Sequence, residues 1–472
     1  MNNEKFYING EWVESNSKDF IDVINPATEE AICQIKLANK EDLDNAVLAA
    51  KNALKPFSSL KQDQKVDLIS SIINSYKKRK EDLVEAIIKE MGAPLSLSTN
   101  AQVPSGLGHF IQAKENLKSF KFHSQINNTS ILKEPIGVCG LITPWNWPLN
   151  QIACKVAPAI AAGCTMVLKP SEIAPLSALI FAEIIDESDL PKGVFNMING
   201  TGLGVGENMS KHPNIDMISF TGSTQAGISV AKNASNSVKR VTQELGGKSA
   251  NLILEDADLV DAVSKGIFHC MNNSGQSCNA PTRMLVPNNK MSQVIDIAKE
   301  VIKKIRIGNP LLKDTTMGPL VSKKQQEKVK EYIEIGIKEG ANLVTGGSAD
   351  PSNIEKGFYV QPTIFANVDN SMTIAREEIF GPVLCIIGYN NLNDAVDIAN
   401  DTIYGLSGYV SGENIDEVRK VASSLKTGMV HINYAPLDQS APFGGYKMSG
   451  NGKEWGTYGI EDFLETKAIM SK

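Results

Sequence analysis

The sequence predicts an α/β protein with two mostly parallel β-sheets, and three observations support this class. From residue 136 to residue 234, short apolar runs alternate with helical stretches at the spacing of βαβ units, which join parallel strands by right-handed crossovers. The same alternation begins again at residue 249 and continues to residue 433. A chain of 472 residues is also too long for one simple core, so two or three domains are expected.

Composition and charge exclude several classes of protein. Apolar residues make up 42% of the chain and charged residues 21%, as in ordinary globular proteins. The net charge is −6 and the basic residues are scattered, so no nucleic-acid partner is expected. The first residues lack a basic region followed by an apolar one, which argues against a signal peptide. The longest nearly apolar run, 156–168, is too short for a membrane span.

Cysteine and histidine usage indicates reduced thiols and no metal site. The seven cysteines are an odd number, lie far apart and include no CxxC pair. This pattern is typical of the cytoplasm and argues against a disulfide framework or a cysteine zinc site. The five histidines are equally scattered and show no metal-ligand spacing. We therefore expect a cytoplasmic protein without a bound metal.

The elements of the first half follow from local patterns. Asn9-Gly10 lies between two apolar and aromatic runs and predicts a hairpin with a tight turn. Helical stretches are expected over 40–53 and 62–91, and a polar, β-leaning segment near 118–133 has no obvious core face and is expected to leave the domain as an arm. Apolar runs then predict strands at 136–145, 165–170, 194–200 and 217–223. Between and after them, helices are expected at 151–162, 176–185, a short one after 203, and one from 224.

The second half repeats the pattern. Apolar runs predict strands at 249–256, 383–389, 408–412 and 428–433. Helices are expected at 259–271, 292–305, 322–340, 393–400 and 416–425, and the third begins at a serine and stops at a glycine, as capped helices do. The last segment, 460–472, predicts a late strand that has no partner nearby in the sequence.

One cysteine, Cys278, has unusual neighbours, in the stretch "NNSGQSCNAPTR". Most free cysteines are bystanders in apolar cores, and that alternative stays open here. Gly275 permits a sharp turn, and the small flanking residues let a ligand approach. The helix before the turn offers Ile267, Phe268 and Met271 as anchors. These features favour a nucleophile, although a thiolate needs a cation or amide dipoles that the sequence does not show.

Two further motifs predict catalytic groups at strand ends. In "QELGGKS", Glu244 precedes a Gly-Gly bend and is placed to face a cleft as a general base for a water or a thiol. The alternative for such a residue is a solvated surface charge. In "TPWNWP", Asn146 lies between two tryptophans and two prolines, so its amide is held stiffly, as an oxyanion donor must be. The alternative is a rigid aromatic turn with no chemical role.

Three weaker motifs indicate a nucleotide. In "SFTGSTQAG", Gly222 and Ser223 precede a helix whose first amides can bind phosphate. "LKPSE" places Lys169 and Glu172 just beyond a strand, where they can grip a ribose, although such a pair is more often a surface turn. "NGTGLGVG" is glycine-rich but lacks the third glycine of the dinucleotide fingerprint, which would fall on Val205.

Together these motifs are more specific than any one alone. "TPWNWP", "LKPSE", "FTGSTQAG", "QELGGKS", "GQSC", "REEIFGPV" and "PFGGYKMSG" occur in this order. The chain resembles the NAD(P)-dependent aldehyde dehydrogenase superfamily, of the non-phosphorylating, hydrolytic type, over essentially its whole length. The resemblance implies a Rossmann-like cofactor-binding domain, an α/β catalytic domain and a small β oligomerisation arm. The implied divisions are 1–116 and 135–246 for NAD binding, 247–454 for catalysis, and 117–134 and 455–472 for the arms.

The resemblance also implies a role for each matching residue. Cys278 matches the nucleophile that forms a thiohemiacetal with the aldehyde and then a thioester. Asn146 and the backbone N–H of Cys278 match the oxyanion donors, and Glu244 matches the base that activates the hydrolytic water. The implied cofactor contacts are Thr143, Trp145, Lys169, Glu172, Gly202, Gly206, Phe220, Gly222, Ser223, Gln325, Glu378 and Phe380. Among these, Lys169 and Glu172 match contacts to the adenosine ribose.

Glu172 favours NAD over NADP. A carboxylate near the ribose accepts a hydrogen bond from the 2′-hydroxyl and repels a 2′-phosphate. Lys169 softens that repulsion, so NADP remains an alternative. The small-molecule partner implied by the family is an aldehyde, and the arms imply a homodimer or homotetramer in which the final strand finds its partner across the interface.

The sequence departs mildly from the family pattern. Gln243, before the base, and Met271, seven residues before the nucleophile, replace the usual side chains at those positions. Asn272 matches a position near the substrate tunnel that is often apolar or aromatic, and Gln151 and Cys154 lie on the helix that usually lines the same tunnel. We therefore expect a tunnel mouth more polar than in enzymes for long aliphatic aldehydes.

Three rival functions stay open at this point. An acyltransferase would pass the acyl group to coenzyme A, but such relatives commonly lack the base that Glu244 supplies. A non-catalytic protein of the same fold would not need Cys278, Glu244 and Asn146 together. A cysteine hydrolase would need a histidine, and the only one nearby in the sequence, His269, is expected on a buried helix.

Overall fold

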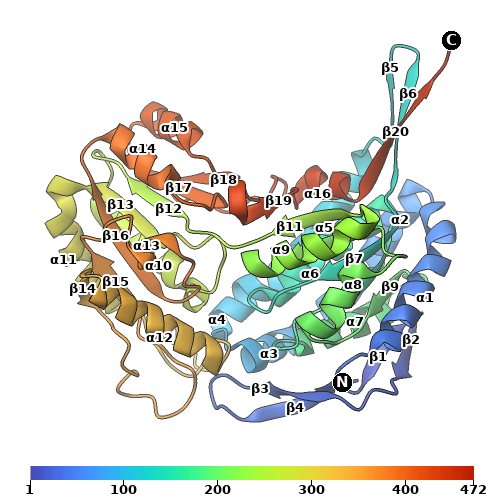
Figure 1. The fold of residues 1–472 in the computed structure, drawn as a ribbon, viewed down its shortest axis with the longest axis horizontal. Helices are drawn as coiled ribbons and strands as arrows, with labels where there is room; N and C mark the ends of the chain where they lie inside the picture. Colours follow the sequence, from blue (N-terminus) through green and yellow to red (C-terminus); the bar gives the residue numbers. More distant parts are fainter. Residues whose placement is uncertain (1) are drawn as a thin grey trace.

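The computed structural model describes residues 2–472 and contains two large sheets (Figure 1). The first comprises β1 (Lys5–Ile8), β2 (Glu11–Glu14), β7 (Val138–Ile142), β8 (Thr165–Lys169), β9 (Phe195–Met197), β10 (Met217–Thr221), β11 (Arg240–Glu244) and β19 (Gly450–Asn451). Their order across the sheet is β19-β11-β10-β7-β8-β9-β1-β2, and the five strands from β11 to β9 are parallel.

The second sheet forms the other half of the molecule. It comprises β12 (Ala250–Ile253), β13 (Arg283–Pro287), β14 (Asn342–Thr345), β15 (Thr363–Ala366), β16 (Val383–Tyr389), β17 (Ser407–Ser411) and β18 (Met429–Ile432). The order is β14-β15-β16-β13-β12-β17-β18, and only β14 runs antiparallel to its neighbour. The predicted α/β class with two mostly parallel sheets is therefore confirmed.

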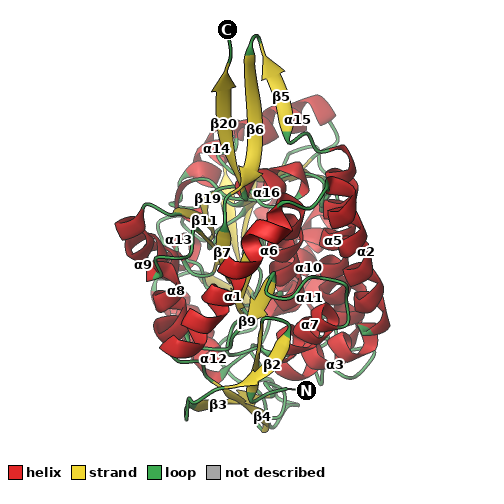
Figure 2. Cartoon of the chain, turned by 90° about the vertical axis from the view of Figure 1, so that its right-hand side faces the viewer, coloured by secondary structure: helices red, strands yellow, loops and turns green. Residues whose placement is uncertain are grey.

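Helices cover both sheets, as Figure 2 shows in red. The helices of the first half are α1 (Lys40–Ser58), α2 (Gln62–Lys78), α3 (Lys80–Met91), α4 (Leu95–Leu97), η1 (Ser98–Gln102), α5 (Val103–Ser119), α6 (Pro148–Ala162), α7 (Leu176–Asp186), η2 (Gly202–Gly206), α8 (Glu207–Lys211), α9 (Thr224–Ala234) and η3 (Ser235–Ser237). Those of the second half are α10 (Leu259–Met271), η4 (Asn272–Gly275), η5 (Asn288–Lys290), α11 (Met291–Ile302), α12 (Lys323–Lys338), α13 (Thr373–Arg376), α14 (Leu392–Asn400), α15 (Ile415–Ser424), η6 (Lys447–Ser449) and α16 (Gly456–Asp462).

The opening hairpin is confirmed, whereas the long helix expected over 62–91 is wrong. In the hairpin, Ile8 pairs with Glu11, and Asn9 and Gly10 have φ of 54° and 71°, as a primed turn requires. The expected helix breaks at Arg79 into α2 and α3, because each part buries its own apolar face. The turn leaves the guanidinium of Arg79 bound to Glu183 of α7.

The final strand has a partner that the sequence did not reveal. β20 (Leu464–Met470) pairs antiparallel with β6 (Thr129–Pro135), which also pairs with β5 (His123–Ile126). The resulting three-stranded arm projects from the body, as expected for the segment near 118–133 (Figures 1 and 2). The expectation that this strand finds its partner only across an interface is therefore wrong, because its partner lies in the same chain, more than 300 residues earlier.

Several elements were not predicted. α5, β13 and the hairpin of β3 (Phe20–Ile24) and β4 (Ala31–Lys36) lack clear capping or alternation signals in the sequence. α5 is continuous with the short α4 and η1, so no break marks its start. It nevertheless packs closely on α6.

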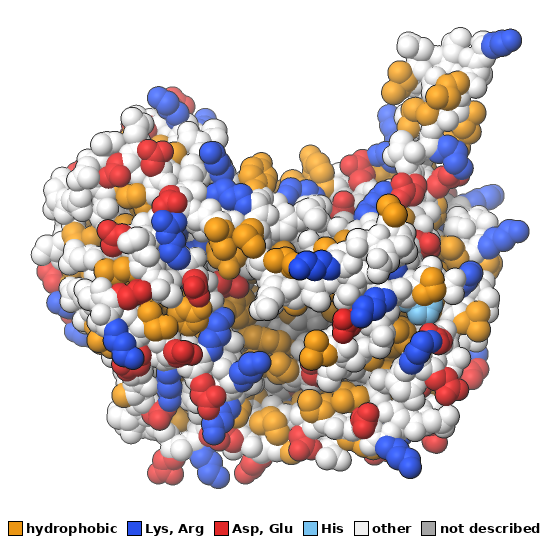
Figure 3. Space-filling view, viewed as in Figure 1, with side chains coloured by type: hydrophobic (Ala, Val, Ile, Leu, Met, Phe, Trp, Pro, Cys, Tyr) orange, Lys and Arg blue, Asp and Glu red, His pale blue; other side chains and the backbone are white. Residues whose placement is uncertain are grey.

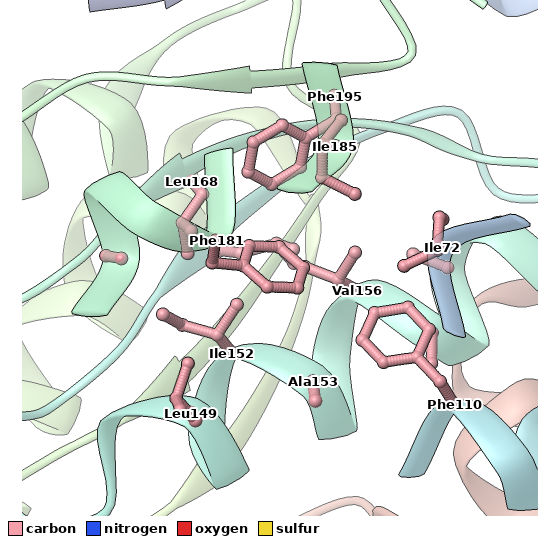
Figure 4. Close-up of a cluster of buried hydrophobic side chains, with 14 of the residues drawn as sticks. Ile72, Phe110, Leu149, Ile152, Ala153, Val156, Leu168, Phe181, Ile185 and Phe195 are labelled. Atoms are coloured by element: carbon pink, nitrogen blue, oxygen red, sulfur yellow. The ribbon is translucent and has the colours of Figure 1, made fainter. Parts of the chain in front are cut away.

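The core of the first half forms around α6, which is almost entirely buried. Figure 4 shows Ile152 and Val156 of this helix among Phe181, Phe195 and Phe110 from neighbouring elements. α6 begins at Pro148, whose fixed φ suits a first helical turn, and ends at Gly163, whose φ of 93° is left-handed. A helix that is buried on nearly every face is a core helix, so α6 holds the loop before it, 143–147, in place.

The surface carries mixed charges. In Figure 3 acidic and basic side chains intersperse over the visible face, which is hollowed between the two halves. Across residues 2–472, no helix combines the length and the apolar character that crossing a bilayer requires.

A buried arginine, Arg283, joins the loops of the second sheet. It begins β13 and is fully buried. Burial lowers its pKa to about 10, so it stays charged at neutral pH. Its guanidinium donates to four acceptors at 2.8–3.0 Å: Lys248 O, Asn370 Oδ1, Ile398 O and Ala399 O. The side chain thus fixes the segment after Glu244 against the strand that follows Cys278.

Replacing this arginine is expected to destabilise the fold. Arg283→Met should lower the free energy of unfolding by about 2–4 kcal/mol, because buried carbonyls lose charged donors. The midpoint of urea unfolding, followed by tryptophan fluorescence, measures the change. Arg376→Met is the control, since Arg376 forms a partly exposed pair with Asp401 and should contribute roughly 1 kcal/mol or less. Equal midpoints for the two variants would contradict the assignment.

Candidate active site

A cleft of about 210 Å³ lies between the two halves. It is lined by Pro144, Trp145, Asn146, Gln151, Thr221, Gly222, Ser223, Glu244, Leu245, Gly246, Cys278, Gln325, Lys328, Glu378 and Phe380. The structure therefore brings Cys278, Glu244 and Asn146 together with six of the expected cofactor residues: Trp145, Gly222, Ser223, Gln325, Glu378 and Phe380.

Strand register explains why residues far apart in the sequence meet here. Ile142 of β7 pairs with Phe220 of β10, and Thr221 pairs with Glu244 of β11. Ile142 also pairs with Lys169 of β8. These strands are parallel, so their carboxyl ends lie at one edge of the sheet, where ligands bind in such folds.

The turn before Cys278 is strained and closely packed. Asn273, Ser274 and Gly275 have successive φ values of 54°, 56° and 72°. A Cβ at Gly275 would lie 2.1 Å from the carbonyl oxygen of Gly381, so only glycine fits there. The Asn273 amide donates to the carbonyl of Asn146 at 3.0 Å, which holds the turn against the neighbouring loop. The small and polar residues around the cysteine therefore build the turn.

The Asn146 amide is aimed at this turn. It is buried, and its Nδ2 donates to the carbonyl of Gln276 at 3.0 Å. The Gln102 amide donates to the Asn146 carbonyl at 3.0 Å, which fixes the backbone from the other side. Trp147 ties the same two loops together, because its Nε1 donates to Ser277 Oγ at 2.8 Å. An amide has two N–H donors, so one remains for a ligand beside Cys278.

The Cys278 thiol is protonated at rest. Burial raises its pKa well above the ordinary value, and the negative charges of Glu378 and Glu244 raise it further. The thiol must therefore lose its proton as it reacts.

Glu244 ends β11 and is buried, and neither of its carboxylate oxygens has a hydrogen-bond partner among the described residues. Burial raises its pKa strongly, the nearby Glu454 raises it further, and Lys155 opposes the rise. A buried carboxylate with a raised pKa is a stronger base than an exposed one, as proton abstraction from water requires. Its orphaned oxygens leave room for a water molecule.

One wall of the cleft fits the nicotinamide end of a dinucleotide. The Glu378 carboxylate accepts from the backbone N–H of Gly247 at 2.9 Å through one oxygen. Phe380 has a φ of 60°, which turns its ring edge-on to Trp145 at 5.4 Å and 84°. The Gln325 amide donates to the Phe380 carbonyl at 2.8 Å, so this predicted contact also supports the loop.

Another wall fits a diphosphate. Ser223 caps α9, and its Oγ accepts from the backbone N–H of Ala226. α9 therefore begins beside the cleft, whose lining includes Gly222 and Ser223, and a helix N-terminus can bind phosphate. Gly222 lies against the Phe220 ring, because a Cβ there would lie 2.6 Å from the ring edge.

The remaining predicted residues form a group around Lys169, outside the lining of this cleft. The Lys169 ammonium donates to Glu172 at 3.1 Å and to the Gly200 carbonyl at 2.6 Å. The backbone N–H of Thr143 bonds to the Lys169 carbonyl, and Gly206 lies against the lysine side chain. Gly202 begins η2, and a Cβ added to it would have no other atom within 4 Å. Burial lowers the pKa of Lys169, whereas Glu172 raises it.

Sequence reasoning missed four residues that the structure places at or beside the cleft. Lys328 lies one helical turn after Gln325 in α12, and that spacing was a usable signal. Its Nζ donates to the Glu378 carbonyl at 3.1 Å. Thr221 also lines the cleft. Lys155 and Glu454 act on Glu244, and 299 residues separate them, so no spacing signal existed.

Two expectations about α10 are wrong. The helix buries Ile267 and Met271, as expected, but Phe268 is 42% exposed and does not anchor the turn. His269 is also exposed, its Nδ1 bonds to the Lys265 carbonyl, and its ring packs on Tyr434. An amphipathic helix on the outside of a sheet leaves one face in solvent. This position does not support a cysteine–histidine pair.

No metal site and no disulfide occur within residues 2–472. No group of three or more His, Cys, Asp or Glu side chains there can hold a metal ion. All seven cysteines are free thiols.

Comparisons with known proteins identify relatives along the whole chain. A model of the aldehyde dehydrogenase family matches residues 12–469. The chain is 53% identical over 467 residues to 3-succinoylsemialdehyde-pyridine dehydrogenase from a Pseudomonas species, which covers 99% of this chain and 98% of that protein.

Solved structures of aldehyde dehydrogenases also match this chain. A mutant of aldehyde dehydrogenase C from Pseudomonas syringae, complexed with NAD+ and octanal, matches with a TM-score of 0.99 at 50% identity, over 99% of this chain and 97% of that one. Betaine aldehyde dehydrogenase from Staphylococcus aureus, in complex with NAD+, matches with a TM-score of 0.95 at 38% identity, over 99% of this chain and 95% of that one.

The raised pKa of Cys278 predicts its alkylation behaviour. Iodoacetamide reacts with thiolates, so Cys278 should react slowly at neutral pH and faster as the pH rises. Glu378→Gln removes a negative charge and should speed alkylation at about pH 8 by roughly threefold or more. Mass spectrometry of the labelled peptides measures the rates, with half-buried Cys33 as the internal control. Fast labelling of Cys278 at about pH 6 would contradict the assignment.

Proposed function

The chain belongs to the aldehyde dehydrogenase family, and on that premise we propose that it oxidises an aldehyde to the carboxylic acid with NAD+. In this proposal Cys278 is the nucleophile, Asn146 the oxyanion donor and Glu244 the base. The observation that carries it is the meeting of these three side chains in one cleft, although they come from loops far apart in the sequence.

The first step is attack of the Cys278 sulfur on the aldehyde carbon. A C–S bond forms, the carbonyl π-electrons move to oxygen, and the thiol proton passes to solvent water. The resulting oxyanion accepts hydrogen bonds from the free N–H of the Asn146 amide and from the backbone N–H of Cys278. Donors that meet charge only after attack lower the barrier, and losing one typically costs on the order of a hundredfold in rate or more.

The second step converts the thiohemiacetal into a thioester on Cys278. When bound, NAD+ supplies the acceptor for the hydride that leaves the former aldehyde carbon. The residues we propose for holding it include Ser223 and Gly222 at the diphosphate, Lys169 and Glu172 at the adenosine ribose, and Glu378 at the nicotinamide ribose. The others are Thr143, Trp145, Gly202, Gly206, Phe220, Gln325 and Phe380, with Lys328 added from the cleft. The free carboxylate oxygen of Glu378 and the open amides of α9 support this fit.

The third step is hydrolysis. Glu244 takes a proton from a water molecule, whose oxygen attacks the thioester carbon, and the C–S bond breaks to release the carboxylate. The base works only when ionised, and burial and Glu454 raise its pKa. The hydrolytic rate should therefore rise with pH through that raised pKa.

We propose NAD+ in preference to NADP+. Glu172 is bonded to Lys169 but retains a second carboxylate oxygen for a ribose hydroxyl. A 2′-phosphate there would meet a negative charge. The NAD+ bound in the structures of the Pseudomonas syringae and Staphylococcus aureus relatives supports the same choice.

An acyltransferase that uses coenzyme A remains the second candidate. Glu244 argues against it, because hydrolysis needs this base and transfer to a thiol does not. Turnover without coenzyme A would distinguish the two.

We also propose a homodimer or homotetramer assembled through the arm segments 117–134 and 455–472. Both outer strands of the arm, β5 and β20, offer unpaired edges to another copy. The NAD-binding domain would comprise 1–116 and 135–246, and the catalytic domain 247–454. Seven free thiols support a reducing compartment such as the cytoplasm.

Burst kinetics test the catalytic assignments. With NAD+ and aldehyde but no coenzyme A, the wild type should release NADH continuously and Cys278→Ala should release none. Glu244→Gln should give a burst approaching one NADH per site, then turnover slower by about 100-fold or more, because the thioester forms but is not hydrolysed. Cys33→Ala is the matched control and should behave as the wild type. Undiminished turnover by Cys278→Ala would refute the proposal.

The polarity of the cleft predicts the preferred substrates. Gln151 lines the cleft, where an apolar side chain would suit an alkyl chain, and Asn272 is exposed at the start of the turn before Cys278. We therefore expect kcat/KM to be higher for short polar or aromatic aldehydes than for octanal. Gln151→Met should reverse this order by raising kcat/KM for octanal about tenfold relative to the polar aldehydes. It removes a polar group that an alkyl chain leaves unpaired. Fastest turnover of long-chain aldehydes by the wild type would contradict this expectation.

A further inference from the structure

A segment near the C-terminus, residues 443–456, passes beside the proposed base, and we call it the strap. Its two ends pair with each other: Phe443 and Glu454 exchange backbone hydrogen bonds of 2.8 and 2.7 Å. Its middle pairs with β11, where Gly450 lies opposite Glu244. The strap is therefore attached by backbone pairing to the strand that carries the base.

One residue of the strap, Trp455, has a conformation that only glycine normally adopts. Its φ is 71° and its ψ is 163°. A bulky side chain in this region costs free energy, so the conformation persists only where its surroundings enforce it. Such outliers are informative because they cluster at functional sites.

The surroundings of Trp455 are aromatic. The indole stacks on Phe443 with ring centroids 4.5 Å apart and planes 29° apart. The ring of His109 lies 5.2 Å away on α5. The next residue, Gly456, donates its backbone N–H to the Gln439 carbonyl at 3.1 Å. These contacts hold the indole on one side of the strap.

The residue before Trp455, Glu454, carries its carboxylate into the interior. Its carboxylate forms a buried ion pair with Lys155 of α6 and accepts from Cys154 Sγ at 3.3 Å. Lys155 also donates to Ser219 Oγ at 3.1 Å. Burying an unpaired carboxylate or ammonium costs free energy, and pairing the two reduces that cost. The position of Glu454 therefore decides whether the Lys155 charge is balanced by a negative charge.

This ion pair lies close to the strand that carries Glu244, because Lys155 bonds to Ser219 on the neighbouring β10 and Gly450 of the strap pairs with Glu244 itself. The charged groups acting on Glu244 come from three elements: Lys155 on α6, Lys453 and Glu454 on the strap, and Asp462 on α16. Glu454 and Asp462 raise the pKa of Glu244, and the two lysines lower it. The Glu244 charge also raises the pKa of two thiols, Cys278 and Cys154 of α6.

We propose that Trp455 is a positioning residue for hydrolysis, which keeps the Glu454 carboxylate on Lys155 beside Glu244. Phe443 and His109 hold the indole, the indole fixes the strained backbone, and that backbone directs Glu454 inward. The proposal rests on the assignment of Glu244 as the base. If Glu454 left its place, the unbalanced Lys155 charge would favour the ionised form of Glu244 and make it active at lower pH.

The test is the pH profile of acyl-enzyme decay after the NADH burst, from about pH 5.5 to about pH 9.5. Trp455→Gly keeps the backbone conformation accessible but removes the stacked ring, so the rising limb should move to lower pH by about half a pH unit. Glu454→Gln should move it in the same direction. The double variant should show no shift beyond that of Glu454→Gln, because both changes act through the same carboxylate.

The matched control is Trp455→Phe, which retains an aromatic ring and should keep the wild-type profile. A uniform loss of rate by Trp455→Gly at every pH, without a shift, would mean that Trp455 has only a structural role. A full shift by Trp455→Gly in the Glu454→Gln background would also overturn the proposal.

Phe443→Leu tests the same proposal if Trp455→Gly does not fold. It removes the stacked partner and leaves Trp455 in place, so a smaller shift in the same direction is expected, and an unshifted profile counts against the proposal. A wild type without a burst would refute the assignment of the nucleophile instead. A wild type with a burst and variants with unshifted profiles would refute only the role of Trp455.

Discussion

The site depends on the alignment of three parallel strand ends. β7, β10 and β11 finish at one level because Ile142 pairs with Phe220 and Thr221 pairs with Glu244. Their loops therefore enter one cleft from the carboxyl edge of the sheet. The second sheet contributes differently, since Cys278 and Glu378 precede β13 and β16 and so lie at the amino ends of its strands. The reactive groups thus meet only where the two sheets abut.

This arrangement places two acidic groups in a partly enclosed cleft, and burial there raises the pKa of both. Desolvation raises the pKa of both Cys278 and Glu244, and each negative charge makes ionisation of the other less favourable. Neither group is therefore a strong nucleophile or base at rest. The same burial that keeps the thiol inactive strengthens the interaction of the Asn146 amide with a developing oxyanion, because the effective dielectric is low. Reactivity is confined to the moment when a substrate fills the cleft.

Local patterns in the sequence were sufficient to predict most of the fold. Apolar runs predicted β7, β8 and β10, and Asn9-Gly10 predicted the opening hairpin, because these signals are contained within a few residues. Long-range pairing was not predictable in this way. β20 finds β6 across more than 300 residues, and the break at Arg79 depends on α7, which follows much later.

The site residues divide in the same way, into those that local motifs predict and those that depend on long-range contacts. Cys278, Glu244 and Asn146 belong to short motifs at strand ends or turns, so their meeting in the cleft could be anticipated from those motifs. The exposed position of His269 could not, because a helical pattern shows that one face is buried but not which residues at its margin are covered. Lys155 and Glu454 were missed for another reason. Each looks like an ordinary surface charge in the sequence, and only the tertiary structure buries the pair beside Glu244.

Part of the backbone strain in this protein lies beside the cleft. Asn9 and Asn127 adopt left-handed conformations in exposed hairpin turns, where asparagine tolerates them. Ser274, Phe380 and Trp455 adopt positive φ values in packed surroundings, and each lies beside a proposed catalytic or cofactor-binding residue. Such conformations persist only when neighbouring contacts enforce them, as Gly381 does at the cysteine turn and Phe443 does at the strap. The rigid helix α6 lies between these two places and supports both, because Trp147 at its start holds the cysteine turn and Lys155 in its middle holds the strap. The buried core around α6 therefore offsets the cost of holding the reactive loops in place.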